Sequence, residues 1–410
     1  MTRSTASTST RNAARGTRNG VFVLSAARTP IGKLMGGLAE LPATQLGSIA
    51  IRAAIDRAGL EPSVIDEVIM GQVIQAGAGQ APARQASIAA GVPTSANATT
   101  LNKVCASGLE AINQAAHAIR AGDSTVVVAG GMESMSQGPH LLPKARFGYR
   151  IGPATLQDAV VYDGLWSPWD DHHMGMSAEA IAEKRGITRQ EQDEYSLRSH
   201  RRALAATRAG RFKAEIVPVE VPARRGSPTV VDTDEGPRPD TSSEALARLQ
   251  PAFTPSGTVT AGNAPGFTDG AAATIVAGTA TVNAHGLTPL ARVVGYASAA
   301  TDPLWLFEAP ELALKKLFER TGTTVQDWDL LEINEAFAAQ IVANGKALNW
   351  DWDRVNVNGG AIALGHPLGA TGARLVVTLL HALKQRGLER GIAGLCHGGG
   401  GAVAMAFELV

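Results

Sequence analysis

Four side chains that can take part in covalent or proton-transfer chemistry occur in stretches of small residues. They are Cys105 in NKVCASGLEA, Asn334 in EINEAF, His366 in GGAIALGHPLGATGAR and Cys396 in GLCHGGGGA. A thiolate is a strong nucleophile, and an imidazole with a pKa near neutrality can take the proton of a thiol. A second thiol can move another proton in the same reaction. These residue types suggest acyl transfer, in which one thiol carries the acyl group and the other transfers a proton.

Cys105 stands directly before a predicted helix. Unpaired backbone N–H groups and the helix dipole favour an anion at a helix N-terminus, so this position favours a thiolate. Ser107 and Gly108 permit a tight turn into the helix. A cysteine among small residues is also a common core residue. The choice between core residue and nucleophile therefore depends on the other motifs.

His366 and Asn334 are candidate partners of that thiol. Glycines surround His366 and let backbone and ligand approach closely, while Pro367 fixes the chain after it. A structural histidine in a glycine-rich turn is the alternative, and it fits so many glycines less well. Asn334 could hold a water molecule or donate to a developing oxyanion. It could equally be an ordinary turn or cap residue, and the sequence leaves both open.

Cys396 ends a predicted strand and precedes a run of four glycines. A glycine run after a strand can bind phosphate, but neither GxGxxG nor a phosphate-loop pattern is present, which argues against a nucleotide-binding loop. Cys396 is thus the second thiol at the end of a strand, a position where ligands commonly bind in α/β sheets.

The elements that must position these residues occur twice. The segment 42–73 predicts an amphipathic helix, a glycine stop, a turn and a strand around Val68 to Met70, and the segment 309–337 repeats that order. Asp66 and Asp329 precede Cys105 and His366 at similar distances. A helix and a strand follow each of these two residues. The pattern predicts an α/β fold made of two copies of one βαβ-rich domain.

The domain boundaries follow from this duplication. We expect a disordered tail at 1–20, an N-terminal domain at 21–137 that is completed by about 260–286, and a C-terminal domain at 287–410. The segment 138–259 is rich in proline, glycine and charged residues, which predicts a loop-dominated insertion. An insertion of that length is usually functional.

Composition excludes several classes of partner. The 37 Lys and Arg balance the 37 Asp and Glu, so no overall positive field attracts nucleic acid or an anionic membrane. No apolar stretch is long enough to span a bilayer. The two cysteines are too few for a disulfide framework and suit a reducing compartment. We expect a cytoplasmic protein. The tail has four Arg and no acid, so a transit peptide to the mitochondrial matrix is the alternative.

With these motifs assembled, the sequence resembles the thiolases, and among them the type that forms acetoacetyl-CoA. The resemblance runs from about residue 21 to 410 and rests on NKVCASG, GGMESMS, NEAFA, GGAIALGHPLGATGAR and the Cys-x-Gly of LCHGGG. It implies a five-layer αβαβα fold and a homodimer or homotetramer. It also implies acyl-CoA molecules as small-molecule substrates, with coenzyme A as cosubstrate and no metal or other cofactor.

The resemblance also implies a role for each motif residue. Cys105 would be acylated after activation by His366, and Cys396 would take a proton from the methyl group of a second acetyl-CoA. One thioester oxygen would be stabilised by His366 with a water held by Asn334. The other would accept from the backbone N–H groups of Cys105 and Gly398. The implied reaction is the reversible condensation of two acetyl-CoA to acetoacetyl-CoA and coenzyme A.

Substrate-binding residues follow from the same resemblance. Those that would contact pantetheine, acyl group or adenine are Leu165, His173, Met174, Arg224 and Phe337. Two features depart from the family pattern. Pro265 stands where many members carry a serine near the thioester, and Leu306 and Phe307 replace a common Met-Gly pair. These departures leave the acyl-chain length open.

Four alternatives remain at this point. A 3-ketoacyl-CoA thiolase of fatty-acid β-oxidation has the same machinery with a longer acyl pocket. A decarboxylating ketosynthase normally lacks a base such as Cys396. A non-catalytic acyl-CoA carrier would be expected to have lost one of the three central residues. A zinc site in the run Asp170 to His173 is disfavoured because adjacent loop residues rarely face one metal.

Overall fold

The computed structural model describes residues 20–223 and 227–410. Its main sheet has two halves with the same strand order. In the N-terminal half the order is β4 (Asn97–Leu101), β3 (Glu67–Gly71), β5 (Val126–Ser134), β12 (Thr268–Gly278) and β1 (Val21–Arg28). In the C-terminal half it is β14 (Leu330–Ile333), β15 (Arg390–His397), β16 (Gly401–Leu409) and β13 (Ala291–Ala300), with a bridge from Leu331 to Val355 outside β14. The halves meet where β1 pairs with β13.

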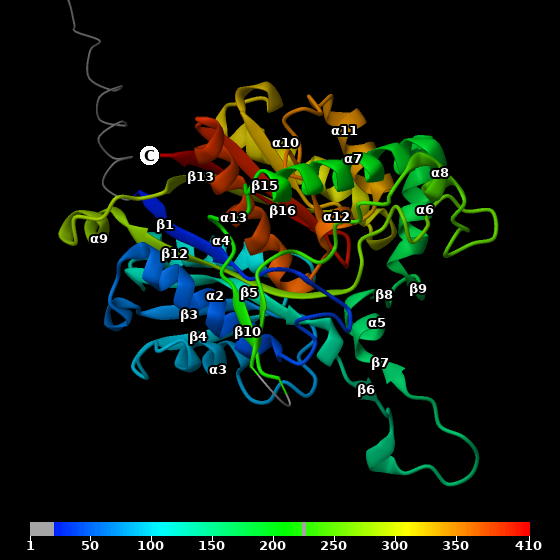
Figure 1. Cartoon of the computed structure of the whole chain (residues 1–410), viewed down its shortest axis with the longest axis horizontal. Coiled ribbons are helices and arrows are strands. Elements are labelled where there is room, and N and C mark those ends of the chain that lie inside the picture. The colour runs from blue at the N-terminus through cyan, green and yellow to red at the C-terminus, as the bar shows by residue number, and fades with distance from the viewer. Residues whose placement is uncertain (1–19, 224–226) are drawn as a thin grey trace, which may run out of the picture.

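Helices form three layers around the two sheet halves (Figure 1). On the outer side of the N-terminal half lie α2 (Ala43–Ala58) and α3 (Pro82–Ala89). Between the halves lie α4 (Ser107–Ala121) and α13 (Leu368–Arg386), which pack against each other. Outside the C-terminal half lie α10 (Ala309–Thr321) and α11 (Ala338–Leu348). The predicted five-layer αβαβα architecture is confirmed.

The apolar content of the inner helices explains their place in the middle. Nearly every residue of α13 from Leu368 to Leu383 is buried, as expected for a helix covered by a sheet on each side. Glycines allow the close contacts that this layer needs. A Cβ at Gly131 of β5 would lie 1.9 Å from the carbonyl oxygen of Gly369, so strand and helix approach backbone to backbone there.

The duplication is visible in hydrogen bonds as well as in strand order. The Oδ2 atom of Asp66 accepts from the backbone N–H groups of Thr125 and Val126, where β5 begins. The Oδ2 atom of Asp329 accepts from the N–H groups of Glu389 and Arg390, where β15 begins. Each aspartate therefore fixes the first residues of the strand that follows the inner helix of its own half.

The insertion between the halves is more helical than we expected. It contains α5 (Ala159–Gly164), α6 (Met174–Arg185), α7 (Arg189–Arg208) and α8 (Ser243–Ala247). Its strands are short: β6 (His140–Leu141), β7 (Gln157–Asp158), β8 (Trp166–Ser167), β9 (His172–His173), β10 (Val219–Val221) and β11 (Thr229–Val231). The helix α7 starts with a capping box formed by Thr188 and Glu191, a local signal that the many charged residues of this segment obscured.

The remaining elements are short. They are β2 (Gly32–Lys33), α9 (Thr279–Ala284), α12 (Ala361–Leu364) and the 3₁₀ turns η1 (Pro62–Val64), η2 (Met135–Gln137), η3 (Ala145–Phe147), η4 (Pro303–Glu308) and η5 (Val325–Asp327). Within 20–223 and 227–410, none of the helices has both the length and the apolar composition that crossing a membrane requires.

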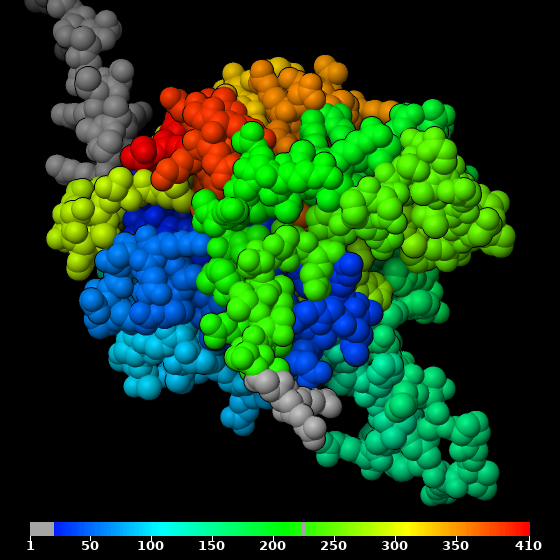
Figure 2. Space-filling model, viewed as in Figure 1, coloured from blue at the N-terminus to red at the C-terminus, as the bar shows by residue number. Residues whose placement is uncertain are grey.

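An arm formed by residues 139–158 projects from the body of the molecule (Figures 1 and 2). The strands β6 and β7 pair at its base, and η3 lies near its tip. The arm exposes large apolar side chains, among them Phe147 and Ile151, which are more than nine-tenths accessible. Apolar side chains so exposed are unusual on an isolated monomer and are typical of an interaction surface.

Candidate active site

A cavity of about 300 Å³ lies at the junction of the two sheet halves and the insertion. Cys105, His366, Cys396 and Gly398 all contribute to its wall. The first two precede the inner helices α4 and α13, and the last two lie where β15 ends. The strand ends and helix starts of both copies therefore converge on one cavity, which is the placement that an α/β fold favours for ligands.

The turn that carries Cys105 is strained and locally braced. Val104 has a left-handed φ of 47°, which is costly for a β-branched residue and is often found at functional sites. The side chain of Asn102 accepts a hydrogen bond from the Val104 N–H at 2.9 Å. The Ser107 hydroxyl donates to the Val104 carbonyl at 2.6 Å and accepts from the Lys103 N–H at 2.8 Å. These bonds hold the thiol at the cavity wall.

His366 is oriented by the first turn of α13. The Thr371 hydroxyl donates to the Pro367 carbonyl at 2.9 Å, so its oxygen accepts from the Nδ1–H of His366 at 2.7 Å. Nδ1 therefore carries the ring proton. On the other side, the Asn334 amide lies 3.4 Å from Nε2 of His366. This tautomer leaves Nε2 as the atom that can take a proton.

Asn334 and Glu335 occupy the turn between β14 and α11. Asn334 is fully buried behind His366, and within the described part of the chain its Oδ1 atom has no hydrogen-bond partner. Glu335 accepts from Tyr195, Ser199, Asn356 and the Ile362 N–H, all within 3.0 Å. The carboxylate thus joins this turn to α7 and to the loop that leads to His366.

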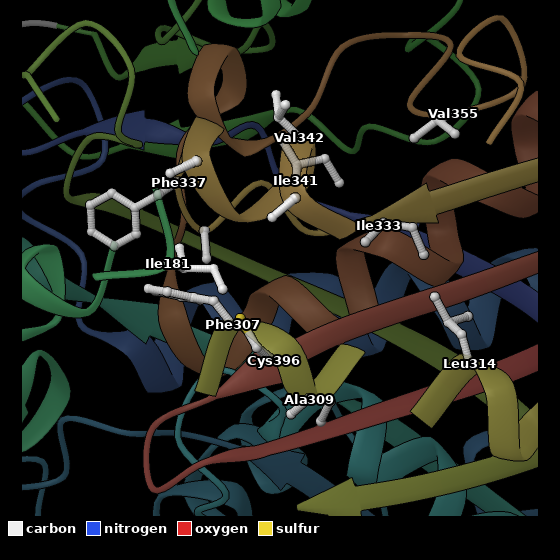
Figure 3. Close-up of a cluster of buried hydrophobic side chains, with 14 of the residues drawn as sticks. Ile181, Phe307, Ala309, Leu314, Ile333, Phe337, Ile341, Val342, Val355 and Cys396 are labelled. Atoms are coloured by element: carbon white, nitrogen blue, oxygen red, sulfur yellow. The ribbon is translucent and has the colours of Figure 1, made fainter. Parts of the chain in front are cut away.

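Cys396 lies in the wall formed by the C-terminal hydrophobic core, on β15 (Figure 3). Phe307, Phe337 and Ile181 belong to the same cluster, so the thiol faces an apolar surrounding on that side. Burial raises the pKa of Cys396 well above its ordinary value, and the nearby sulfur of Cys105 raises it further. The two thiols line the same cavity, which is where such an effect arises.

The ionisation of Cys105 differs from the prediction. Burial raises the pKa of its thiol to about 12, although the backbone N–H groups of Cys105 and Gly398 oppose the rise. Desolvation thus outweighs the donors at the helix start, and the raised pKa disfavours the thiolate that the helix start favours. Burial, with a smaller contribution from Arg374, lowers the pKa of His366 to about 3. These shifts favour the neutral forms of both thiols and of the imidazole in the resting site.

The structure places four of the five predicted substrate-binding residues on this cavity: Leu165, His173, Met174 and Phe337. The fifth, Arg224, lies outside the described residues. The three residues at which the chain departs from the family pattern, Pro265, Leu306 and Phe307, also line the cavity. Phe307 meets Phe337 edge to face at 5.5 Å between ring centres, so the part of the wall that shares a cluster with Cys396 is aromatic.

Sequence reasoning missed three residues that shape the site. Phe253 stacks on His173 at 4.9 Å between ring centres, yet it comes from a distant loop without a motif. Thr371 orients His366, and its place five residues later, in the first turn of a predicted helix, was an available signal. Arg238 is the third, and it lines a neighbouring cavity.

That neighbouring cavity has a volume of about 380 Å³ and is more polar. It shares Ala261, Ala264, Gly266 and Phe267 with the catalytic cavity, so the two adjoin. Its charged and polar wall residues include Lys33, His200, Arg238 and Asp240. A long ligand with an apolar reactive end and an anionic end could occupy both.

The run Asp170 to His173 is occupied by local contacts. Asp170 and Asp171 accept from Ser167 and from the indole of Trp166, and His173 accepts from the Gly175 N–H as the N-cap of α6. In the described ranges no three His, Cys, Asp or Glu side chains are grouped as a metal site requires.

Comparisons with known proteins agree with this geometry. The family model for the thiolase N-terminal domain matches residues 21–280, and that for the C-terminal domain matches residues 287–409. An acetyl-CoA acetyltransferase of Cupriavidus necator is 52% identical over 388 residues, which is 95% of this chain and 99% of that protein. One from Escherichia coli K12 is 50% identical over 387 residues, 94% of this chain and 98% of that protein. The crystal structure of the Bacillus anthracis acetyl-CoA acetyltransferase superposes with a TM-score of 0.94 at 44% identity, covering 96% and 99% of the two chains.

Proposed function

The chain belongs to the thiolase family, and from that premise we propose that it is an acetyl-CoA acetyltransferase. It condenses two acetyl-CoA to acetoacetyl-CoA and coenzyme A through an acetyl-cysteine, and it catalyses the reverse thiolysis. The observation that carries the proposal is the convergence of two thiols and one imidazole on a single, largely apolar cavity.

The first half-reaction forms the acetyl-enzyme. The Cys105 sulfur attacks the thioester carbonyl of acetyl-CoA, and the thiol proton moves to Nε2 of His366. The carbon–sulfur bond to coenzyme A breaks, and its thiolate takes the proton of Cys396. A neutral resting site supports this order, since Cys396 then has a proton to give and His366 has a free lone pair. The products are acetyl-Cys105, free coenzyme A, a Cys396 thiolate and a His366 imidazolium.

The second half-reaction returns both protons. The Cys396 thiolate removes a methyl proton from a second acetyl-CoA, and the resulting carbanion attacks the acetyl carbonyl on Cys105. The bond between acetyl carbon and Cys105 sulfur breaks, acetoacetyl-CoA forms, and the sulfur recovers its proton from His366. Splitting the reaction in this way replaces one difficult step by two easier ones.

Negative charge on the thioester oxygens needs donors in both halves. The N–H groups of Cys105 and Gly398 lower the pKa of the Cys105 thiol, which supports their use for the oxygen of the bound acyl group. His366 with a water on Asn334 serves the other oxygen. Asn334 Oδ1 is buried and has no hydrogen-bond partner among the described residues, so a water molecule could donate to it there.

The coenzyme A moiety extends from the catalytic cavity into the polar one. Its pantetheine arm passes Leu165, His173, Met174 and Phe337, and its phosphates and adenine approach Arg238. We infer that Arg238 is the cation that binds the phosphate and adenine end of coenzyme A. A contribution from Arg224 stays a prediction.

We infer that the partner is a second copy of the chain, as a homodimer or homotetramer. The strand β4 ends the described path of the main sheet, and its free edge can pair with another strand. The apolar arm 139–158 offers a second contact surface. We infer a cytoplasmic location, because both cysteines are free and the reaction needs them reduced.

The test of this function is thiolysis of acetoacetyl-CoA by free coenzyme A. The account expects efficient turnover, with ping-pong kinetics. If the protein fails on acetoacetyl-CoA but cleaves longer 3-ketoacyl-CoAs, the site assignment stands and the substrate assignment is wrong. Absence of turnover with both would contradict the enzymatic assignment and favour an acyl-CoA carrier.

A further inference from the structure

His397 lies on the wall of the catalytic cavity, although none of the steps above uses it. It is the last residue of β15, directly after Cys396. Its Nδ1 atom lies 2.7 Å from the carbonyl oxygen of Gly398. Since a carbonyl oxygen only accepts, the ring donates through Nδ1–H, and Nε2 carries no proton in the neutral form.

The turn that His397 contacts is intrinsically loose. Gly398, Gly399 and Gly400 connect β15 to β16, and the last two have left-handed φ angles of 86°. Glycines have more conformational freedom than any other residue, so such a turn has little preference of its own. Yet Gly398 lines the same cavity as Cys105, its N–H lowers the pKa of that thiol, and it must keep its direction to stabilise negative charge there. Contacts outside the glycines must supply that precision.

Two contacts fix this turn on opposite sides. The carbonyl of Gly400 accepts from the Thr301 N–H at 2.8 Å, which anchors its far end. The imidazole of His397 anchors its near end by holding the Gly398 carbonyl. Fixing that carbonyl limits rotation about Gly398, and the N–H of the same residue is thereby held in direction.

The ring itself is held by close packing on Gly401. A Cβ added to Gly401 would lie 2.2 Å from Nε2 and 2.3 Å from Cε1 of His397. Any side chain at 401 would therefore push the imidazole away from its place. The two residues face each other as partners across the hairpin of β15 and β16. This contact provides a second, independent way to disturb the ring.

The surroundings keep His397 neutral. Burial lowers its pKa, and Lys103 lowers it further, while the Gly398 carbonyl and Glu110 act in the opposite direction. Lys103 and Glu110, which precede and follow Cys105 in the sequence, form an ion pair at 3.0 Å. A neutral ring with a fixed Nδ1–H is suited to holding a carbonyl.

We propose that His397 is a positioning residue that sets the direction of the Gly398 N–H toward the sulfur of Cys105. It acts through the glycine turn and does not exchange protons with the substrate. The inference rests on the proposed function only for the turnover readout. The reactivity of Cys105 toward an alkylating agent reports on the same donor without any acyl-CoA.

The test compares His397→Leu, which removes the donor, with His397→Asn, which keeps one at a similar distance. In the leucine variant we expect kcat for thiolysis to fall about tenfold or more, because a misdirected oxyanion donor loses much of its value. KM for coenzyme A should stay within about twofold, since none of the residues inferred to contact coenzyme A is changed. Alkylation of Cys105 by iodoacetamide should require a higher pH in the leucine variant. The asparagine variant should recover most of the wild-type kcat and most of the wild-type alkylation rate.

His381→Leu is the matched control, because His381 also places Nδ1 against a backbone carbonyl, that of Val377, at 2.8 Å. It lies on α13 and does not line the catalytic cavity. Gly401→Ala should displace the imidazole and cause the same losses of kcat and alkylation as His397→Leu, although His397 itself is unchanged. Unchanged kcat and unchanged alkylation in His397→Leu would overturn the proposal, as would asparagine behaving no better than leucine. If alkylation shifts as expected but no variant turns over acetoacetyl-CoA, the positioning role stands and the proposed function fails.

Discussion

The turn before α4 and the turn before α13 occupy equivalent places in the two copies, yet they hold their reactive residues differently. The Cys105 turn is strained at Val104 and braced by neighbours in sequence, Asn102 and Ser107. The His366 turn is fixed through Glu335, which gathers α7 and the loop before His366, and through Thr371. A Cβ at Gly365 would lie 2.3 Å from Thr268, so this turn is also tightly packed.

This difference matches the two tasks. A nucleophile must reach a substrate carbonyl, carry the acyl group and leave it again, so a short local brace at the cavity wall suffices. A base must keep one tautomer and one direction in both half-reactions, which needs a rigid surrounding. One duplicated scaffold thus supplies a thiol from one copy and an imidazole from the other. Burial shifts the pKa of each group toward its neutral form in the free protein.

The largest expected effect comes from removing the nucleophile in the turn before α4. Cys105→Ala should reduce thiolysis by about four orders of magnitude or more, because it removes the atom that forms the covalent intermediate. Steady-state kinetics with acetoacetyl-CoA measure this loss. An active Cys105→Ala enzyme would contradict the account, whereas a thermal midpoint close to the wild type would show that the fold is intact.

Removal of the second thiol should have the next largest effect. Cys396→Ala should lower turnover about 10² to 10⁴-fold, the range for loss of a general acid or base. Exchange of the methyl protons of acetyl-CoA with solvent deuterium, followed by NMR, should disappear along with it. Persistence of this exchange in the variant would assign the base elsewhere.

The tautomer of His366 can be disturbed without removing the ring. Thr371→Val takes away the acceptor for Nδ1–H, and we expect kcat to fall about tenfold as the ring loses its fixed proton arrangement. Thr378→Val is the matched control, since Thr378 is also buried on α13 but donates to Glu215. Equal effects of the two variants would show that only packing, and not the tautomer, was lost.

The adjoining cavity should affect binding more than chemistry. Arg238→Ala is expected to raise KM for coenzyme A about fivefold with kcat little changed, because Arg238 lies at the far end of the ligand and contributes equally to ground and transition states. Arg248→Ala, on an exposed residue that does not line that cavity, is the control. A fall in kcat at constant KM would place Arg238 nearer the chemistry than we infer.

The smallest effect concerns stability and pH. The pKa of His366 is about 3 in the folded protein against an ordinary 6.5, so below pH 6.5 the unfolded chain takes up a proton that the folded chain does not. Stability is therefore lost as the pH falls from 6.5 toward 3, by about 2 kcal/mol for this group at about pH 5.

His366→Asn should remove the part of the stability loss at low pH that His366 causes. Thermal unfolding of wild type and variant at pH 6.5 and at about pH 5 measures the difference in stability loss. If the two proteins lose the same stability between these pH values, the depressed pKa assigned to His366 is wrong.

Much of the fold was predictable because its signals are local and occur twice. The helix–turn–strand order around Asp66 and Asp329 predicted the repeat, and the glycine-rich motifs predicted which residues face the cavity. The helices of the insertion were partly missed, since their apolar faces are short and interrupted by charges.

The ionisation of the site could not be predicted from local sequence. The helix start after Cys105 favours a thiolate, but the surrounding protein removes water from the sulfur and reverses the preference. Phe253 and Arg238 also reach the cavities through tertiary structure alone, from loops that carry no motif. Such contacts depend on how distant segments pack, which one sequence does not state.

The central claim is that Cys105 carries the acetyl group while Cys396 moves the proton. Incubating Cys396→Ala with acetyl-CoA and mapping the modified peptide by mass spectrometry tests it most directly. The account predicts an acetyl group on the peptide that contains Cys105. The coenzyme A thiolate then takes its proton from water, so this half-reaction still proceeds, while the acetyl group accumulates because the second half-reaction is blocked. An unmodified Cys105 peptide, or an acetyl group on Cys396 of the wild type, would contradict it.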